Sequence, residues 1–251
     1  MKQKRTVRAK RRLAAGGLCL AMAMTLCACG GEAPQPTETP AQTQTPAAVQ
    51  TPEPTPEEIV LSHEYVTRFE EVNLVTYPAF TFAYPDGWKI TEEKVEAETE
   101  HVTLENDRGV KIIHALYLYP KDYSFGGSSA TMTRVQVTKA ADSQFVPGYV
   151  QGTDHRGLGD FMVAKLKTTG QLNMQTDAEF TDVDGSTAYA VVPASYEGTR
   201  EDVRGLNEVE FSFWYSGHVA FVCQAPDGVL TEQETREVLA ILSSFRVKEI
   251  V

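Results

Sequence analysis

Alternating apolar and polar positions recur through residues 59–251 and predict β-strands. Ala79–Tyr84 alternates in this way and stops at Pro85–Gly87, a Pro-Asp-Gly sequence that is typical of a turn. Further apolar segments flank Asn106–Gly109, so we expect a β-hairpin there. Another strand is predicted around Arg134–Lys139.

Two more hairpins are predicted in the second half of the chain. Asp184-Gly185 would join a strand at Ala178–Val183 to a strand at Thr187–Val192. The other hairpin would turn at Ser216-Gly217, because apolar side chains share one face on both sides of it. These are Val209, Phe211, Phe213 and Tyr215 before the turn, and Val219, Phe221 and Cys223 after it.

Two segments have helical patterns. Thr231–Glu234 forms a capping box, followed by apolar residues at helical spacing up to Phe245. A second helix is predicted from Asp160 as N-cap to Gly170 as C-cap, with two lysines in its last turns (Lys165 and Lys167). The order of elements predicts an α+β fold with a central antiparallel sheet flanked by helices, covered at least partly on both faces.

The first 28 residues have the layout of a secretory signal peptide. Seven Lys or Arg residues and no acid precede an uncharged stretch at Leu13–Leu26. This stretch is short for a membrane span, which needs about 20 residues, although an uncleaved anchor helix is an alternative. Either interpretation places the rest of the chain outside the cytoplasm.

Leu26-Cys27-Ala28-Cys29 resembles the lipobox of bacterial lipoproteins. The resemblance implies that Cys29 is acylated and that the chain is cut between Ala28 and Cys29. Two or three acyl chains anchor a protein stably in a membrane, whereas a single chain does so only marginally. An ordinary signal peptide is the alternative.

Composition separates the mature chain into two parts. Residues 29–58 follow the signal peptide and contain seven of the 13 prolines, so we expect a lipidated N-terminus and a disordered Pro/Thr-rich tether. Residues 59–251 are expected to form one globular domain. Because the net charge after residue 28 is -18, compared with -11 for the whole chain, we expect no nucleic-acid partner.

The body resembles PsbP-like domains at both of its ends. Phe80–Trp88 is a strand running into Tyr-Pro-x-x-Trp, and the last hairpin leads through Ala225-Pro226 to a helix that closes on Ile241–Phe245. This resemblance implies an α/β/α sandwich with a central antiparallel sheet, and mostly protein-binding roles. It brings no catalytic set with it.

Candidate chemical groups are scattered. His114 shares a face with Ile112 and Leu116 and is expected in the core, whereas His155 is expected in a solvated loop. Asp182 and Asp184 hint at a calcium loop, but the later Glu is missing and a hairpin turn explains them.

Other groups are better explained by structure than by chemistry. Glu96, Glu98 and Glu100 alternate and are expected on a solvated edge strand. Gly126–Ser129 is expected to be a loop rather than a nucleophile elbow. Buried packing is expected for three further residues, although a tryptophan left at the surface would be a contact hot spot: Cys223, Trp88 and Trp214.

We therefore expect a monomeric lipoprotein held on the cell membrane by lipid on Cys29, facing outside the cytoplasm. The leading function is a non-enzymatic binding or assembly module for an envelope protein partner, with no cofactor, catalytic residue or metal. A carrier or sensor of a small ligand or divalent cation is the alternative, and an enzyme comes third. A pocket with converging ionisable groups would favour the enzyme, an apolar groove the carrier, and an exposed aromatic patch protein binding.

Overall fold

The computed structural model describes residues 58–70, 77–118 and 131–248. The predicted signal peptide, Ala28, Cys29, the tether and Gly126–Ser129 lie outside the described residues. The described residues belong to one compact unit.

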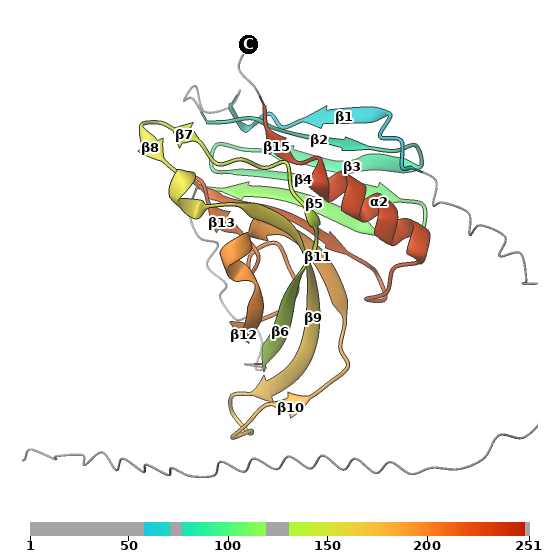
Figure 1. Cartoon of the computed structure of the whole chain (residues 1–251), viewed down its shortest axis with the longest axis vertical. Helices are drawn as coiled ribbons and strands as arrows, with labels where there is room; N and C mark the ends of the chain where they lie inside the picture. The colour runs from blue at the N-terminus through green and yellow to red at the C-terminus, as the bar shows by residue number, and fades with distance from the viewer. Residues whose placement is uncertain (1–57, 71–76, 119–130, 249–251) are drawn as a thin grey trace, which may run out of the picture. The chain divides into compact units, whose positions relative to one another are not determined.

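Strands predominate in this unit (Figure 1). They are β1 (His63–Val66), β2 (Phe80–Tyr84), β3 (Trp88–Val95), β4 (Thr99–Asn106), β5 (Lys111–Tyr117), β6 (Thr131–Asp142), β7 (Tyr149–Val150), β8 (Thr153–Asp154), β9 (Phe161–Asn173), β10 (Thr181–Asp182), β11 (Thr187–Pro193), β12 (Gly198–Val203), β13 (Phe213–Trp214), β14 (His218–Gln224) and β15 (Arg246–Val247). The helical elements are α2 (Glu232–Ser243) and the 3-10 turns η1 (Arg156–Leu158) and η2 (Ala194–Tyr196).

Ten of the described strands form one antiparallel sheet. Its main path runs β12-β6-β9-β11-β14-β5-β4-β3, with β10 paired to β9 and β13 paired to β14. A second sheet has the order β1-β2-β15, and α2 lies beside it over the same face of the large sheet (Figure 1). Strands β6 and β9 bend and extend well beyond the helix (Figure 1).

The predicted helix-flanked α/β/α sandwich is wrong. Among the described residues α2 is the one complete α-helix, and the predicted helix at residues 160–169 is strand β9. The reason is that Met162, Ala164 and Leu166 alternate with Phe161 and Val163, and both sets are buried. A strand that is covered on both faces has apolar residues on both of them. The helix prediction assumed a single apolar face, and for that reason it failed.

The two faces of the sheet have separate cores. The face under α2 and β2 is rich in aromatic residues, and Phe245 stacks on Phe80 and Phe221 at ring-centroid distances of 5.3 and 4.6 Å. The other face is packed with smaller side chains, among them Val137, Ala190 and Val222. The expectation that both faces are covered is confirmed in these regions.

Two predicted hairpins differ in part from the structure. Strands β10 and β11 do not pair with each other; both pair with β9, one after the other, around the break at Asp184-Gly185. The turn at Ser216-Gly217 is confirmed, but the strand before it is only Phe213–Trp214. Phe211 packs in the core on the other face of the sheet, apart from Phe213 and Tyr215. The alternation across Val209–Tyr215 therefore does not correspond to one long strand.

Three other local predictions are confirmed. Strand β2 ends at Pro85–Gly87, and Gly87 has the positive φ (89°) that favours glycine. The hairpin around Asn106–Gly109 joins β4 to β5. Helix α2 begins with the predicted capping box, in which Thr231 and Glu234 bond each other's backbone N–H groups.

Candidate functional site

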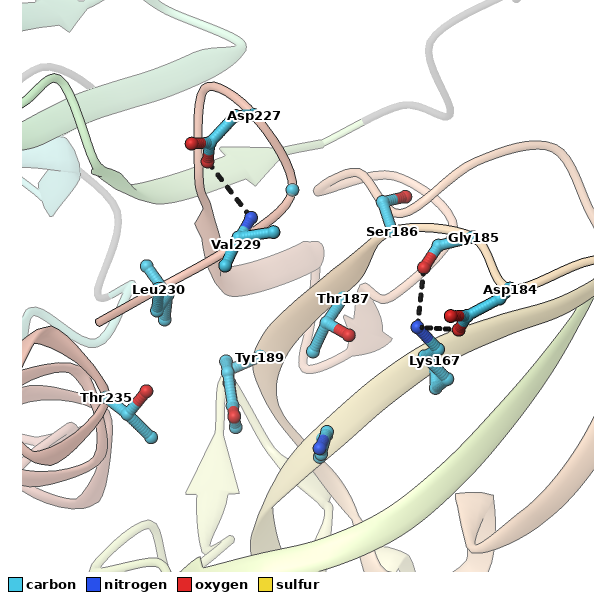
Figure 2. Close-up of a pocket in the computed structure, with 12 residues that line it drawn as sticks. Lys167, Asp184, Gly185, Ser186, Thr187, Tyr189, Asp227, Val229, Leu230 and Thr235 are labelled. Carbon is cyan, nitrogen blue, oxygen red and sulfur yellow. Dashed lines mark hydrogen bonds and ion pairs between the residues drawn. The ribbon is translucent and has the colours of Figure 1, made fainter. Parts of the chain in front are cut away.

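The candidate site is a hollow beyond the first turn of α2, with a volume of about 700 Å³ (Figure 2). Its floor is formed by β9 and β11. One wall is the turn at Asp184–Ser186, and the other is the loop Asp227–Leu230 between β14 and α2. Thr235 of α2 closes one end.

Strand register brings four polar side chains together on the floor. Lys165 pairs with Tyr189 across β9 and β11, and Lys167 pairs with Thr187. Because residues two apart on a strand share a face, these four side chains form a compact group. On the same face of β9, Phe161 is buried in the aromatic core. This face of the strand therefore changes from apolar at Phe161 to polar at Lys165 and Lys167.

The walls need close backbone approach. A Cβ at Gly185 would lie 2.8 Å from Cβ of Thr168, and one at Gly228 would lie 2.9 Å from Cβ of Ser186. Gly228 also has a positive φ of 73°. Glycine at these two positions therefore lets the loops pack tightly and shapes the hollow.

Charges in the hollow are partly paired. The ammonium of Lys167 lies 2.6 Å from Asp184 and donates to the Gly185 carbonyl at 2.7 Å (Figure 2). This ion pair lowers the pKa of Asp184. The carboxylate of Asp227 accepts from the Val229 N–H and from Arg108, and these bonds lower its pKa. For Lys165 the described residues provide no ion pair.

The uncharged groups are mostly hydroxyls. Burial raises the pKa of Tyr189, so the phenol keeps its proton. Ser186 and Thr187 add two further hydroxyls. Lysine and hydroxyl donors together suit recognition of a polar or negatively charged ligand.

Arg108 connects this hollow to the start of α2. Its guanidinium donates to both carboxylate oxygens of Glu234, at 2.6 and 2.8 Å, and to Asp227 at 3.1 Å. The bidentate bond lowers the pKa of Glu234 to about 2. The β4–β5 hairpin is thereby joined to the helix and to one wall of the hollow.

A second group of ionisable side chains is buried in the aromatic core. Nε2 of His114 lies 3.7 Å from Oε2 of Glu100, and both side chains are fully buried. Oε1 of Glu100 accepts the Arg68 backbone N–H at 2.7 Å, whereas neither ring nitrogen of His114 has a hydrogen-bond partner among the described residues. The core position predicted for His114 is confirmed, but the exposed position predicted for Glu100 is wrong.

His155 also differs from its prediction. It is buried rather than solvated, because its ring bonds Ser216 Oγ at 2.8 Å and packs on Tyr215. Its neighbours Asp154 and Arg156 form an ion pair with each other. This arrangement fixes the loop structurally.

The other candidate residues have structural surroundings. Asp182 is paired with Arg134 at 2.9 Å, and Asp184 with Lys167, so both carboxylates of the suggested calcium loop have cationic partners. In the described residues no three His, Cys, Asp or Glu side chains lie together as a metal site needs. Cys223 is buried as expected, and burial raises the pKa of its thiol.

The two tryptophans differ. Trp88 is buried as predicted and its indole donates to Glu237 at 2.8 Å. Trp214 is 50% exposed, so its predicted core position is wrong. It lies in β13 at the start of the last hairpin, on the opposite side of the strand from the buried Phe213, and contacts His218 edge-on.

The comparisons with known proteins found no matching family model, no matching curated protein and no matching solved structure. A search for spanning segments found no described helix with the length and hydropathy that crossing a bilayer requires.

From the sequence, Lys165 and Lys167 are expected only as late residues of a helix. The alternation of Phe161, Val163, Lys165 and Lys167 on one face was the signal for their true position. Tyr189, Thr235 and the loop at Asp227 carried no such signal, because only the fold brings them to the same hollow.

Proposed function

We propose that this chain is a lipid-anchored extracytoplasmic binding module. Its domain binds another molecule without transforming it chemically. The basic and apolar N-terminal segment and the lipobox-like Leu26–Cys29 support export and anchoring. The hollow at the N-terminal end of α2 supports binding of a small ligand, and it is the observation that carries this function.

The chemistry of the hollow favours binding over catalysis. Its aspartates are held by Lys167, Arg108 and the backbone of Val229, and its buried phenol at Tyr189 keeps its proton. A catalytic base needs a pKa near the working pH, whereas these groups are moved away from it. Fixed donors around an open floor fit a carrier or sensor.

The test uses residues 55–251, the compact unit that contains both described cores. Small molecules extracted from the source cells are added, and thermal unfolding is followed. We expect a raised midpoint, and native mass spectrometry of the mixture should show an adduct of defined mass. In Thr187→Trp, which fills the floor of the hollow, the stabilisation should be lost.

The outcome is decisive when Thr187→Trp has a native circular-dichroism spectrum. Stabilisation that persists in this variant would contradict binding in the hollow, and so would a wild-type domain that no fraction stabilises. If the variant is unfolded, Ser186→Trp at the rim replaces it in the same assay.

A protein partner is the second candidate, favoured by the exposed indole of Trp214. Half-exposed tryptophans are frequent contact hot spots. A photoreactive residue at position 214 should crosslink to one specific protein on intact cells, and the crosslink should persist in Thr187→Trp. The same label at Lys89, an exposed residue, serves as control. Equal labelling from both positions would contradict this candidate.

The anchor has its own test. Mass spectrometry of the mature protein should find an N-terminal peptide that begins at Cys29 and carries diacylglycerol. Cys29→Ala should abolish this modification and the cleavage before residue 29. An unmodified N-terminus at another residue would overturn the lipoprotein assignment in favour of an ordinary signal peptide.

A further inference from the structure

We propose that the hollow beyond α2 is an oxyanion site, which takes a carboxylate or phosphate group of a small ligand with Lys165 as its main contact. This inference rests on the proposed ligand-binding function and names the ligand class. It is carried by the arrangement of donors on β9 and β11 and by Lys165 having no ion pair with any described residue.

The two lysines stand next to each other over one floor. Lys165 and Lys167 are two residues apart on the same face of β9, so their Cα atoms are about 7 Å apart. Their cross-strand partners on β11 are Tyr189 and Thr187, which carry hydroxyls. A small anion on this floor can therefore reach ammonium and hydroxyl donors simultaneously.

The strand register places uncharged residues directly beside Lys165. Its partners on the two adjacent strands are Tyr189 on β11 and Thr138 on β6, both uncharged. Lys167 differs, because Asp184 binds it at 2.6 Å. The cross-strand neighbours of Lys165 therefore carry hydroxyls rather than carboxylates. A cation in such surroundings creates a local positive potential even in an acidic chain.

The two carboxylates in the hollow already have other partners. Asp184 is engaged by Lys167, whereas Asp227 shares Arg108 with Glu234, at 3.1 Å, and accepts the Val229 N–H at 3.0 Å. Among the described residues, neither carboxylate forms an ion pair with Lys165. An oxyanion would be held by Lys165 and the Tyr189 hydroxyl, with Thr187 nearby.

The experiment measures binding of inorganic phosphate and of citrate to residues 55–251, by calorimetry and by NMR amide shifts. We expect at least one of the two anions to bind, and its shift changes to centre on Lys165, Thr187 and Tyr189. Comparison of the two anions tells a phosphate group from a carboxylate group. Affinity should fall as sodium chloride is raised, because the contact is between charges.

Two matched variants locate the effect. Lys165→Met removes the charge but keeps an unbranched stem, and it should weaken binding at least tenfold. Lys139→Met is the control, because Lys139 lies on the adjacent strand opposite Ala164 and so belongs to the other face of the sheet. Its affinity should stay within twofold of the wild type.

Equal weakening by both variants would overturn the proposal, since only net charge would then matter. Shift changes outside the hollow, or no binding of either anion at 10 mM, would also overturn it. The proposed function has a separate readout, which is the stabilisation by cell extract and its loss in Thr187→Trp. If that readout holds while both anions fail, the hollow binds a ligand of another class.

Discussion

Two regions on the same face of the large sheet carry ionisable side chains in opposite circumstances. Under β2 and α2, Glu100 and His114 are fully buried among phenylalanines. Beyond the helix, Lys165 and Lys167 stand on an open floor. An ionisable side chain on this face is costly to stability where other elements bury it, and it can bind a ligand where they leave it exposed. The strand that carries the residue does not decide between the two.

The largest effect is expected from emptying the covered region. Phe245 contacts Phe80, Phe145 and Phe221 and is fully buried. Phe245→Ala should therefore lower the free energy of unfolding by about 3–5 kcal/mol, measured by urea denaturation. Trp214→Ala, at an exposed aromatic, should cost less than about 1 kcal/mol. Equal losses would mean that the aromatic cluster is not the main core.

The next effect comes from the buried pair. His114→Phe keeps an aromatic ring against Phe80 and Phe245 but leaves the Glu100 carboxyl without its neighbour, so we expect a loss of about 3 kcal/mol. Adding Glu100→Gln, whose carbonyl can still accept the Arg68 N–H, should restore most of that loss. Urea denaturation of both variants tests this. If His114→Phe alone is neutral, the two groups do not interact.

An intermediate effect belongs to the boundary between the two regions, where Arg108 binds Glu234. The pKa of Glu234 is lowered from its ordinary 4.5 to about 2, so its contribution is complete above pH 4.5 and is lost as pH falls towards 2. We expect a loss of about 1 kcal/mol across this window, measured as the difference between wild type and Glu234→Gln in unfolding at each pH. Parallel pH curves for the two proteins would contradict it.

The smallest effect on stability is expected in the hollow. Asp184→Asn removes an exposed ion pair, which contributes little to folding, so the unfolding midpoint should not change measurably. The same variant frees Lys167 and should raise the affinity for an oxyanion. Calorimetry with phosphate or citrate checks this second effect. A lowered affinity would mean that Asp184 orients Lys167 for the ligand rather than competing for it.

Local sequence rules predicted the elements whose chemistry is local. The capping box at Thr231–Glu234, the turn at Pro85–Gly87 and the hairpin at Asn106–Gly109 are all fixed by neighbouring residues. The core position of His114 followed from alternation on its own strand.

The failures arose where distant segments decide the outcome. Lys165 and Lys167 resembled the end of a helix, and only pairing with β6 and β11 makes the segment a strand. Glu100 resembled a surface residue because it alternates with Glu96 and Glu98, but the chain after β1 lies against it, where the Arg68 N–H donates to its carboxylate. The hollow itself combines β9, β11 and the β14–α2 loop, which no local pattern can bring together.

The pairing of β15 with β2 has a consequence for the timing of folding. The hydroxyl of Ser244, just before β15, accepts the backbone N–H of Ala83 in β2, across a separation of 161 residues. The partners of Phe80 and Phe82 on α2 and Phe245 therefore emerge last during synthesis or export. Until then β2 presents an unpaired edge and an aromatic face, which are prone to aggregation. Such long-range closure also predicts slow folding, in milliseconds to seconds rather than microseconds.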